Sequence, residues 1–443
     1  MILINKMFQR VTLFIICITF LISGMFTGCT KTSNPGSGGG VAATLSLLKG
    51  NNQQGIYGEI LNDTFVLKVL CSDSAARFVI GYKMIQGNGM IPNTYGGYLS
   101  TFTMDGLIRF NWRLGCNNPV QKLELYLYAV DKYNNPATNA SDSIMVTATG
   151  TAPSGWGRSC GCEIQDIFSF KIFTHDNSRL YMVNGGLFYS DDKGINWYKV
   201  EGVPNWNDIN DAQFNSKGWL YIVTMNNGIY YTKDMITWQA INTGILDYRT
   251  PTAFTVEDNT LFVSFYFDGP YMTTNNGDFW RKMPVGFGSQ RYYFIRHHPN
   301  GSIYMFNDWS DLLISSDNGT SWQKTNVNSQ YINYDVYDFG ISSDGNLYIG
   351  SGDATIAALS PQTYTGPVQS YYQWNANSQL IRNIQFFNND VYYLVCYTPN
   401  PGIYTRNNNW SILNLGFTQN IDYYYIKNDG KFLLASNGLY YKN

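Results

Sequence analysis

The sequence predicts an all-β protein: an Ig-like β-sandwich followed by a seven-bladed β-propeller. Residues 41–150 contain short apolar runs separated by Gly- and Asn-rich turns. The second half contains a hairpin motif that returns several times, and hairpins repeating at about 40 residues are typical of propellers. The chain is also rich in residues that favour strands, with 35 Tyr, 26 Phe and 11 Trp.

The N-terminus has the pattern of an export signal in residues 1–28. Lys6 and Arg10 supply the positive charge, residues 11–26 are apolar, and Thr27-Gly28 precede Cys29. This ending resembles the lipobox of bacterial lipoproteins, which implies that Cys29 carries the lipid. Residues 29–40 have the composition of a flexible tether. We therefore expect a cell-envelope protein anchored to a bacterial membrane, with the outer membrane favoured and the exposed side left open. A transmembrane anchor or a cleaved secretory signal is the alternative.

Residues 41–150 are expected to form the sandwich, because turn signals regularly separate their apolar runs. The six runs are Thr44–Leu48, Thr64–Leu70, Phe78–Met84, Gly106–Leu114, Lys122–Val130 and Ser143–Ala148. The segments 50–69 and 105–115 resemble bacterial Ig-like domains of the invasin/intimin type, which implies a spacer role. Cys71 and Cys116 each end one of these runs, and we expect both at the same end of the sandwich, joined by a disulfide. The pairing of Cys160, Cys162 and Cys396 is left open.

Residues 151–443 contain the repeated hairpin, with the pattern Ser/Thr-x-Asp/Asn-x-Gly-x-x-Trp. Its Asp or Asn side chain can bond backbone amides, its Gly can adopt a positive φ, and its Trp can pack between sheets. The repeated residues are Ser190, Asp192, Gly194 and Trp197; Thr273, Asn275, Gly277 and Trp280; Ser315, Asp317, Gly319 and Trp322; and, in a shortened copy, Asp234 and Trp238.

This pattern resembles the Asp-box, or BNR repeat, of sialidase-like and sortilin-like propellers. The resemblance implies that the motif is structural and lies away from any ligand site. Seven blades are expected, with cores at Ile167–Val200, Ala212–Ile241, Ala253–Met283, Tyr293–Thr325, Val336–Trp374, Ile384–Leu413 and Tyr423–Tyr441. The last blade lacks a fourth strand, and residues 154–159, with Trp156, are expected to supply it and to cover the exposed edges.

Charge and composition exclude some functions. The chain is only 14% charged, with a formal net charge of −2, which argues against nucleic-acid binding. The Arg-Ile-Pro motif of sialidases is absent, and residues 151–443 contain only three Glu, with no carboxylate pair at a spacing typical of glycosidases. No Cys/His spacing fits zinc. We assign no catalytic residue, cofactor or metal, and expect a monomer.

Ligands are expected where loops converge at the propeller mouth, opposite the repeated hairpins. Aromatic, Asp and Arg side chains gather in those loops and suit a polyhydroxylated ligand or a peptide. Trp309 is the first choice among the candidates, which are Trp206, Asp208, Tyr248, Arg249, Arg291, Tyr292, Asp308, Trp309, Asp311, Tyr334 and Arg382.

The sequence favours a lipid-anchored binding protein for a glycan or protein ligand. Two alternatives remain. One is a glycoside hydrolase or lyase of the sialidase-like or xyloglucanase-like propeller group. The other is an assembly factor for an envelope complex.

Overall fold

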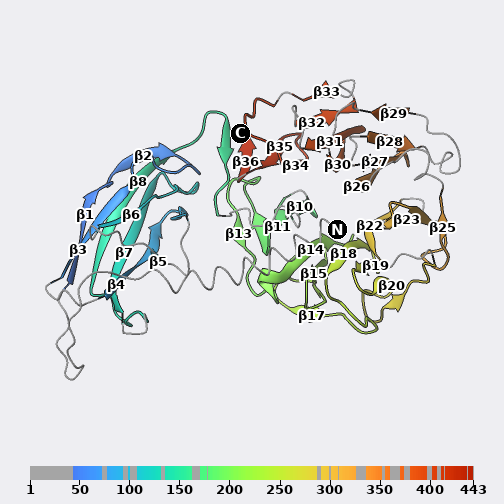
Figure 1. Cartoon of the computed structure of the whole chain (residues 1–443), viewed down its shortest axis with the longest axis horizontal. Coiled ribbons are helices and arrows are strands. Elements are labelled where there is room, and N and C mark those ends of the chain that lie inside the picture. Colours follow the sequence, from blue (N-terminus) through green and yellow to red (C-terminus); the bar gives the residue numbers. More distant parts are fainter. Residues whose placement is uncertain are drawn as a thin grey trace. The chain divides into compact units, whose positions relative to one another are not determined.

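The computed structural model confirms an all-β chain in two compact units, Met1–Ala152 and Pro153–Asn443 (Figure 1). Apart from strands and turns, the described residues contain one 3-10 turn, η1 (Trp206–Asp208), and no α-helix. None of them forms a helix long and apolar enough to cross a membrane. The structure describes residues 43–71, 77–92, 98–99, 107–130, 135–161, 170–176, 178–286, 291–298, 301–307, 309–325, 336–351, 355–359, 370–373, 380–396, 402–406, 411–413, 415–436 and 438–442.

The first unit consists of two sheets that share one core. A three-stranded sheet has the order β1 (Ala43–Lys49), β3 (Phe65–Cys71), β6 (Leu107–Phe110). A five-stranded sheet has the order β2 (Gln53–Ile56), β8 (Asp142–Thr151), β7 (Val120–Val130), β4 (Arg77–Gln86), β5 (Tyr98–Leu99). Every second residue of β7 points inward, so that Leu123 and Leu125 pack in one cluster with Phe65 and Leu67 of the other sheet.

The predicted disulfide between Cys71 and Cys116 is wrong. Cys71 keeps its thiol, while Cys116 and Cys160 are each in a disulfide. The strand register explains the error. Phe65 pairs with Phe110, so β3 runs away from the end at which the chain leaves β6 toward Cys116. Six residues of strand cover about 20 Å, whereas a disulfide needs Cα atoms within about 7 Å.

The second unit consists of seven four-stranded antiparallel sheets within the described ranges. In chain order they are β10 (Lys171–Thr174), β11 (Leu180–Val183), β12 (Leu187–Ser190), β13 (Tyr198–Lys199); β14 (Ile209–Phe214), β15 (Leu220–Thr224), β16 (Ile229–Thr232), β17 (Trp238–Ala240); β18 (Pro251–Glu257), β19 (Thr260–Phe265), β20 (Gly269–Thr273), β21 (Arg281–Lys282); β22 (Tyr292–His297), β23 (Ile303–Asn307), β24 (Leu312–Ser315), β25 (Gln323–Lys324); β26 (Val336–Ile341), β27 (Leu347–Ser351), β28 (Thr355–Leu359), β29 (Ser370–Gln373); β30 (Leu380–Phe387), β31 (Asp390–Cys396), β32 (Gly402–Thr405), β33 (Ser411–Ile412); and β34 (Tyr423–Ile426), β35 (Phe432–Ala435), β36 (Leu439–Lys442), β9 (Trp156–Arg158).

These seven sheets form a closed ring (Figure 1). The first strands of successive sheets contact each other from β10 round to β34. The first and last sheets also meet, because the Ile172 amide donates to the Tyr423 hydroxyl oxygen at 3.2 Å and Phe170 packs edge-on to the same ring. The fourth strand of the last sheet is β9, which comes from the start of the unit and pairs with β36. The Trp156 indole of β9 donates to the Leu415 carbonyl at 3.0 Å.

The repeated turn joins the third and fourth strands of a sheet. In the copy at 315–322 the Ser315 hydroxyl donates to Asp317 Oδ1 and accepts from the Gly319 amide, both at 2.8 Å. Asp317 Oδ1 also accepts from the Ser321 amide at 2.8 Å, so the motif closes on itself. The shortened copy keeps this pattern without its glycine, because Met235 adopts a φ of 62° and its amide donates to the Thr232 hydroxyl at 2.9 Å.

The Trp of each complete repeat packs between sheets. Trp280 is 1% exposed and belongs to the cluster that joins the second and third sheets. Its indole donates to the Ile241 carbonyl of the preceding sheet at 2.6 Å. The neighbouring Phe279 is 58% exposed. The motif therefore couples a self-contained turn to a buried contact with the preceding sheet.

We predict that Trp280→Ala lowers the free energy of unfolding by about 3–5 kcal/mol, because it empties a large buried site between two sheets. Phe279→Ala is the matched control and should change it by no more than about 0.5 kcal/mol, since that side chain lies in solvent. Chemical denaturation of both variants and the wild type measures this. Equal losses in the two variants would show that the Trp does not hold the sheets together.

A second prediction concerns acid stability. Hydrogen bonds from the Ser321 hydroxyl and amide to the carboxylate lower the pKa of Asp317 from 3.8 to about 2. A depressed carboxyl pKa stabilises the fold above the unfolded value, and that contribution is lost as pH falls through the folded value. Asp317→Ala should therefore lower the melting temperature at pH 7, and its difference from wild type should narrow between pH 4 and pH 2. A constant difference across that range would contradict the assignment.

Candidate functional site

Each sheet of the ring has two ends with different kinds of loop. Because the four strands alternate in direction, the links between sheets and the turns between second and third strands share one end. We call this end the link face. The turns between first and second strands, and the repeated turns, share the opposite end, which we call the turn face. The predicted binding residues with a described position belong to segments at or near the link face.

Two of the predicted residues are buried and are not surface contacts. Tyr292, the first residue of β22, is 1% exposed and packs in the core of the fourth sheet. Asp311 is also buried, and its Oδ2 accepts from Lys324 Nζ at 2.9 Å and from Asn307 Nδ2 at 3.1 Å. Their prediction as exposed candidates is wrong, because position in a loop was taken for exposure.

Two others hold loops in place. Asp208 accepts from the Asn226 amide at 3.0 Å and from Asn227 Nδ2 at 2.6 Å, which braces the turn between β15 and β16. Trp206 is half-buried, and its indole donates to the Leu187 carbonyl at 3.2 Å. Both residues therefore have structural partners within the first two sheets.

Tyr248, Arg249 and Arg291 lie in links at the link face, where Tyr248 and Arg249 are exposed and Arg291 is half-buried. The Arg249 guanidinium lies 5.5 Å from the centroid of the Phe267 ring, and that of Arg291 lies 4.0 Å from the Tyr266 ring. The two rings meet edge to face, with centroids 4.9 Å apart. Phe267 is 52% exposed. We call the set Leu246, Tyr248, Arg249, Tyr266, Phe267 and Arg291 the link-face patch.

Ion pairs and hydrogen bonds hold the loops under this patch. Asp247 receives two hydrogen bonds from Arg249, at 2.9 Å from Nε and 2.7 Å from Nη2. These bonds lower the pKa of Asp247 to about 2, so the pair is ionised at neutral pH. In the second loop, Asp268 accepts from the Tyr271 hydroxyl and from the Lys282 ammonium. These contacts brace the two loops that carry Arg249 and Phe267.

Trp309 lies in the turn between β23 and β24 and is exposed. Its amide donates to Asn307 Oδ1 at 3.0 Å. Because Tyr292 pairs with Asn307, Arg291 and this turn lie at the same end of the fourth sheet. Trp309 is therefore an exposed aromatic residue at the link face of the fourth sheet. Asp308, Tyr334 and Cys29 lie outside the described residues, as does the side chain of Arg382.

Sequence reasoning missed Leu246 and Phe267, which are both exposed members of the patch. The predicted candidates all carry a polar group, whereas these two side chains are apolar. The available signal was an apolar side chain inside a polar loop, since Leu246 precedes Asp247 and Phe267 precedes Asp268-Gly269. Among the described residues no His, Cys, Asp and Glu side chains cluster as a metal site would require.

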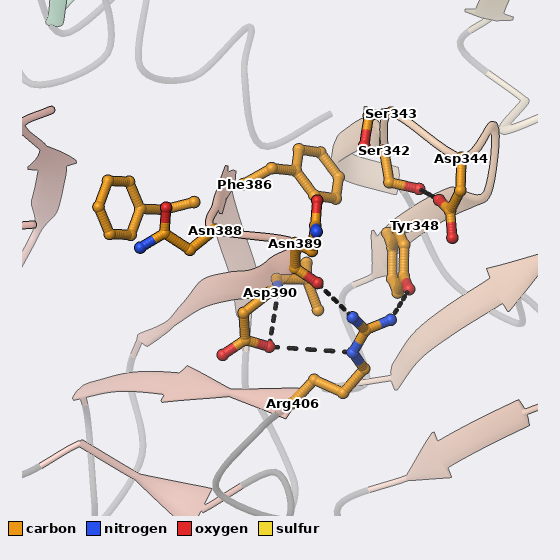
Figure 2. Close-up of a pocket in the computed structure, with 11 residues that line it drawn as sticks. Ser342, Ser343, Asp344, Tyr348, Phe386, Asn388, Asn389, Asp390 and Arg406 are labelled. Atoms are coloured by element: carbon orange, nitrogen blue, oxygen red, sulfur yellow. Dashed lines mark hydrogen bonds and ion pairs between the residues drawn. The ribbon is translucent and has the colours of Figure 1, made fainter.

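The turn face carries a cavity of about 480 Å³ between the fifth and sixth sheets (Figure 2). It is lined by Ser342, Ser343, Asp344, Tyr348, Phe386, Phe387, Asn388, Asn389, Asp390, Val391 and Arg406. None of the predicted binding residues with a described position is among them. This cavity is therefore a second candidate site, on the face opposite the patch.

Comparisons with known proteins support the fold of the second unit. No family model matches the chain. No curated protein matches it either. Among solved structures, it is similar to YCF48 bound to a D1 peptide, with a TM-score of 0.51 and 14% identity over 65% of this chain and 94% of that one. It is also similar to YCF48 from Cyanidioschyzon merolae, with a TM-score of 0.50 and 12% identity over 66% of this chain and 99% of that one.

Both neighbours are β-propellers. The second unit is a β-propeller. At these identities the likeness concerns the fold alone.

Proposed function

We propose that this protein is a lipid-anchored envelope protein whose propeller binds a glycan or protein ligand at the link-face patch. The observation that carries the proposal is the cluster of Arg249, Phe267, Tyr266 and Arg291, in which Arg249 and Phe267 are exposed. Aromatic and Arg side chains are enriched at the energetic centres of interfaces. Holding them in place beforehand lowers the entropy lost on binding.

The same surface suits two ligand classes. Exposed aromatic rings provide faces on which a sugar ring or an apolar side chain can lie. Guanidinium groups donate to carbonyl, hydroxyl or carboxylate oxygens. A bound D1 peptide in one of the YCF48 structures is compatible with a peptide ligand for a propeller. That comparison bears on the fold only, so the ligand class comes from the patch itself.

We further infer that each four-stranded sheet is one blade, which makes a seven-bladed propeller closed by β9. The first unit is proposed to be an Ig-like sandwich that serves as a spacer. Its two sheets share a core that includes the fully buried Trp112, and an Ig-like fold has such a buried Trp between its sheets. The repeated turns are proposed to be Asp-boxes, which agrees with their closed hydrogen-bond pattern.

The anchoring part of the proposal rests on residues 1–40. An apolar run ends in Thr27-Gly28-Cys29, and a Gly-rich segment follows. Diacylation of one cysteine supplies more than one acyl chain, as stable anchoring requires.

We predict that Cys29→Ala abolishes incorporation of labelled palmitate and moves the protein from the membrane fraction to the soluble fraction. Ser33→Ala, in the same segment, is the control and should leave both unchanged. Membrane association that persists in Cys29→Ala, without labelling of the wild type, would rule out a lipid anchor at this position.

The binding prediction compares two exposed phenylalanines on opposite faces. Phe267→Ala should weaken binding about tenfold or more, as truncation of a central interface aromatic does. Phe279→Ala, on the turn face, should leave binding and stability unchanged. The purified chain is screened on a glycan array and a peptide array, and each hit is titrated with both variants.

A hit that binds Phe267→Ala as tightly as wild type would place binding elsewhere. Fluorogenic glycosides are assayed in parallel. Turnover of any of them would replace the binding function with hydrolysis.

A further inference from the structure

The cavity on the turn face lies between the turn after β26 and the turn after β30, and the equivalent turns of the second and third sheets are bridged by hydrogen bonds. In the second and third sheets, the turn after β14 is tied to the turn after β18. Ser216 donates to Asp258, and Lys217 Nζ donates to Asn259 Oδ1 at 2.8 Å. These bonds draw the two turns together across the gap between sheets.

At the equivalent positions of the fifth and sixth sheets, Asp344 replaces Lys217 and Asn389 replaces Asn259. The Asp344 side chain is short and bonds within its own turn, accepting from the Ser342 hydroxyl and from Asn346 Nδ2 at 2.7 Å. It therefore does not span the gap as Lys217 does. The space between these turns is the cavity of about 480 Å³.

An arginine that follows the third strand of the sixth sheet forms one wall. Arg406 Nη1 donates to the Tyr348 hydroxyl at 2.8 Å, and Nη2 donates to the Asn389 carbonyl at 2.5 Å. Its Nε lies 3.8 Å from Asp390 Oδ1 (Figure 2). A guanidinium has five N–H groups, so these contacts fix its plane and leave N–H groups for a ligand. Tyr348 and Asp390 are buried, which makes this wall part of the fold.

The other walls supply complementary groups. Phe386 presents a half-buried aromatic ring, which Figure 2 shows beside the Ser342 and Ser343 hydroxyls. Asp344 lies on the rim, and hydrogen bonds led by the one from the Ser342 hydroxyl lower its pKa, so it is ionised at neutral pH. The cavity thus has an aromatic face, a carboxylate acceptor, a guanidinium donor and several hydroxyl and amide groups.

Charge and polarity narrow the ligand class. Arg406 is offset by Asp390, so the exposed Asp344 disfavours an anionic ligand. A purely apolar ligand would leave the polar groups of the walls without water or partners. A neutral sugar ring meets both conditions, because its hydroxyls both donate and accept while its C–H face can lie on Phe386. The volume is within the range of about 300–1,000 Å³ that is usual for small-ligand sites.

We propose that this cavity binds one unit of a neutral saccharide. The site is separate from the link-face patch, since it lies at the opposite end of the sheets and shares no residue with it. It also differs from the site predicted for the mouth of the propeller.

Two variants close the cavity in different ways. Ser343→Trp places a large side chain at its rim, and Asn428→Trp is the matched control at the same position of the turn after β34, where the residue is also exposed. Asp344→Lys introduces the residue type that the second sheet has at the equivalent position, Lys217. The new side chain should bridge to Asn389 as Lys217 bridges to Asn259. Melting temperatures near that of the wild type establish that each variant is folded.

The full-length chain in detergent is titrated with neutral tetrasaccharides of glucose, galactose, mannose and xylose, followed by ligand-observed NMR. We expect at least one to bind with a Kd below about 1 mM. Ser343→Trp and Asp344→Lys should each weaken it about tenfold or more, and Asn428→Trp should not. Binding unaffected by Ser343→Trp and Asp344→Lys would overturn the proposal, as would no binding by any tetrasaccharide. Loss in Phe267→Ala alone would assign the saccharide to the link-face patch.

Discussion

Each four-stranded sheet of the propeller has two faces to bury, and only a neighbour on each side can bury both. Closure of the ring is therefore the constraint on which the rest of the second unit depends. The fourth strand of the last sheet is β9, which comes from the start of the unit. The two ends of the unit are therefore paired in one sheet. The Ile172 bond to Tyr423 joins the first and last sheets, as the Trp280 bond to Ile241 joins the second and third. The Trp156 indole bond to Leu415 ties β9 to the segment between the sixth and last sheets.

Within that ring, the repeated turns stabilise the fold through local hydrogen bonds, whereas the links between sheets differ from one another. The repeated turns satisfy their own polar groups, as Ser315 and Asp317 do, and they commit their Trp to the core. A turn that is complete in itself has few groups to offer a ligand. The links and the gaps between turns do not repeat, and both candidate sites lie there.

The sequence was sufficient for features set by local chemistry. The turn repeats and the buried Trp follow from residue types within a few positions of each other. The strand supplied by residues 154–159 follows from a count of strands, since the last sheet has only three of its own. The sequence alone did not predict features that depend on how the strands pair. Cys71 ends β3 and Cys116 follows β6, but the pairing of Phe65 with Phe110 places Cys71 at the far end of β3 from the point where the chain leaves β6. Tyr292 follows a link, yet its place as the first inward residue of β22 buries it.

The turn-face cavity shows why one kind of site is hard to find in a sequence. No sequence motif marks it, and the residues that line it come from turns and strands of two different sheets. Lys217 reaches Asn259 across one gap, while Asp344 bonds back to Asn346 beside another. The second gap contains the space lined by Arg406 and Phe386. Repeated contacts between the other sheets hold the ring, so a cavity between two of its sheets is compatible with the fold.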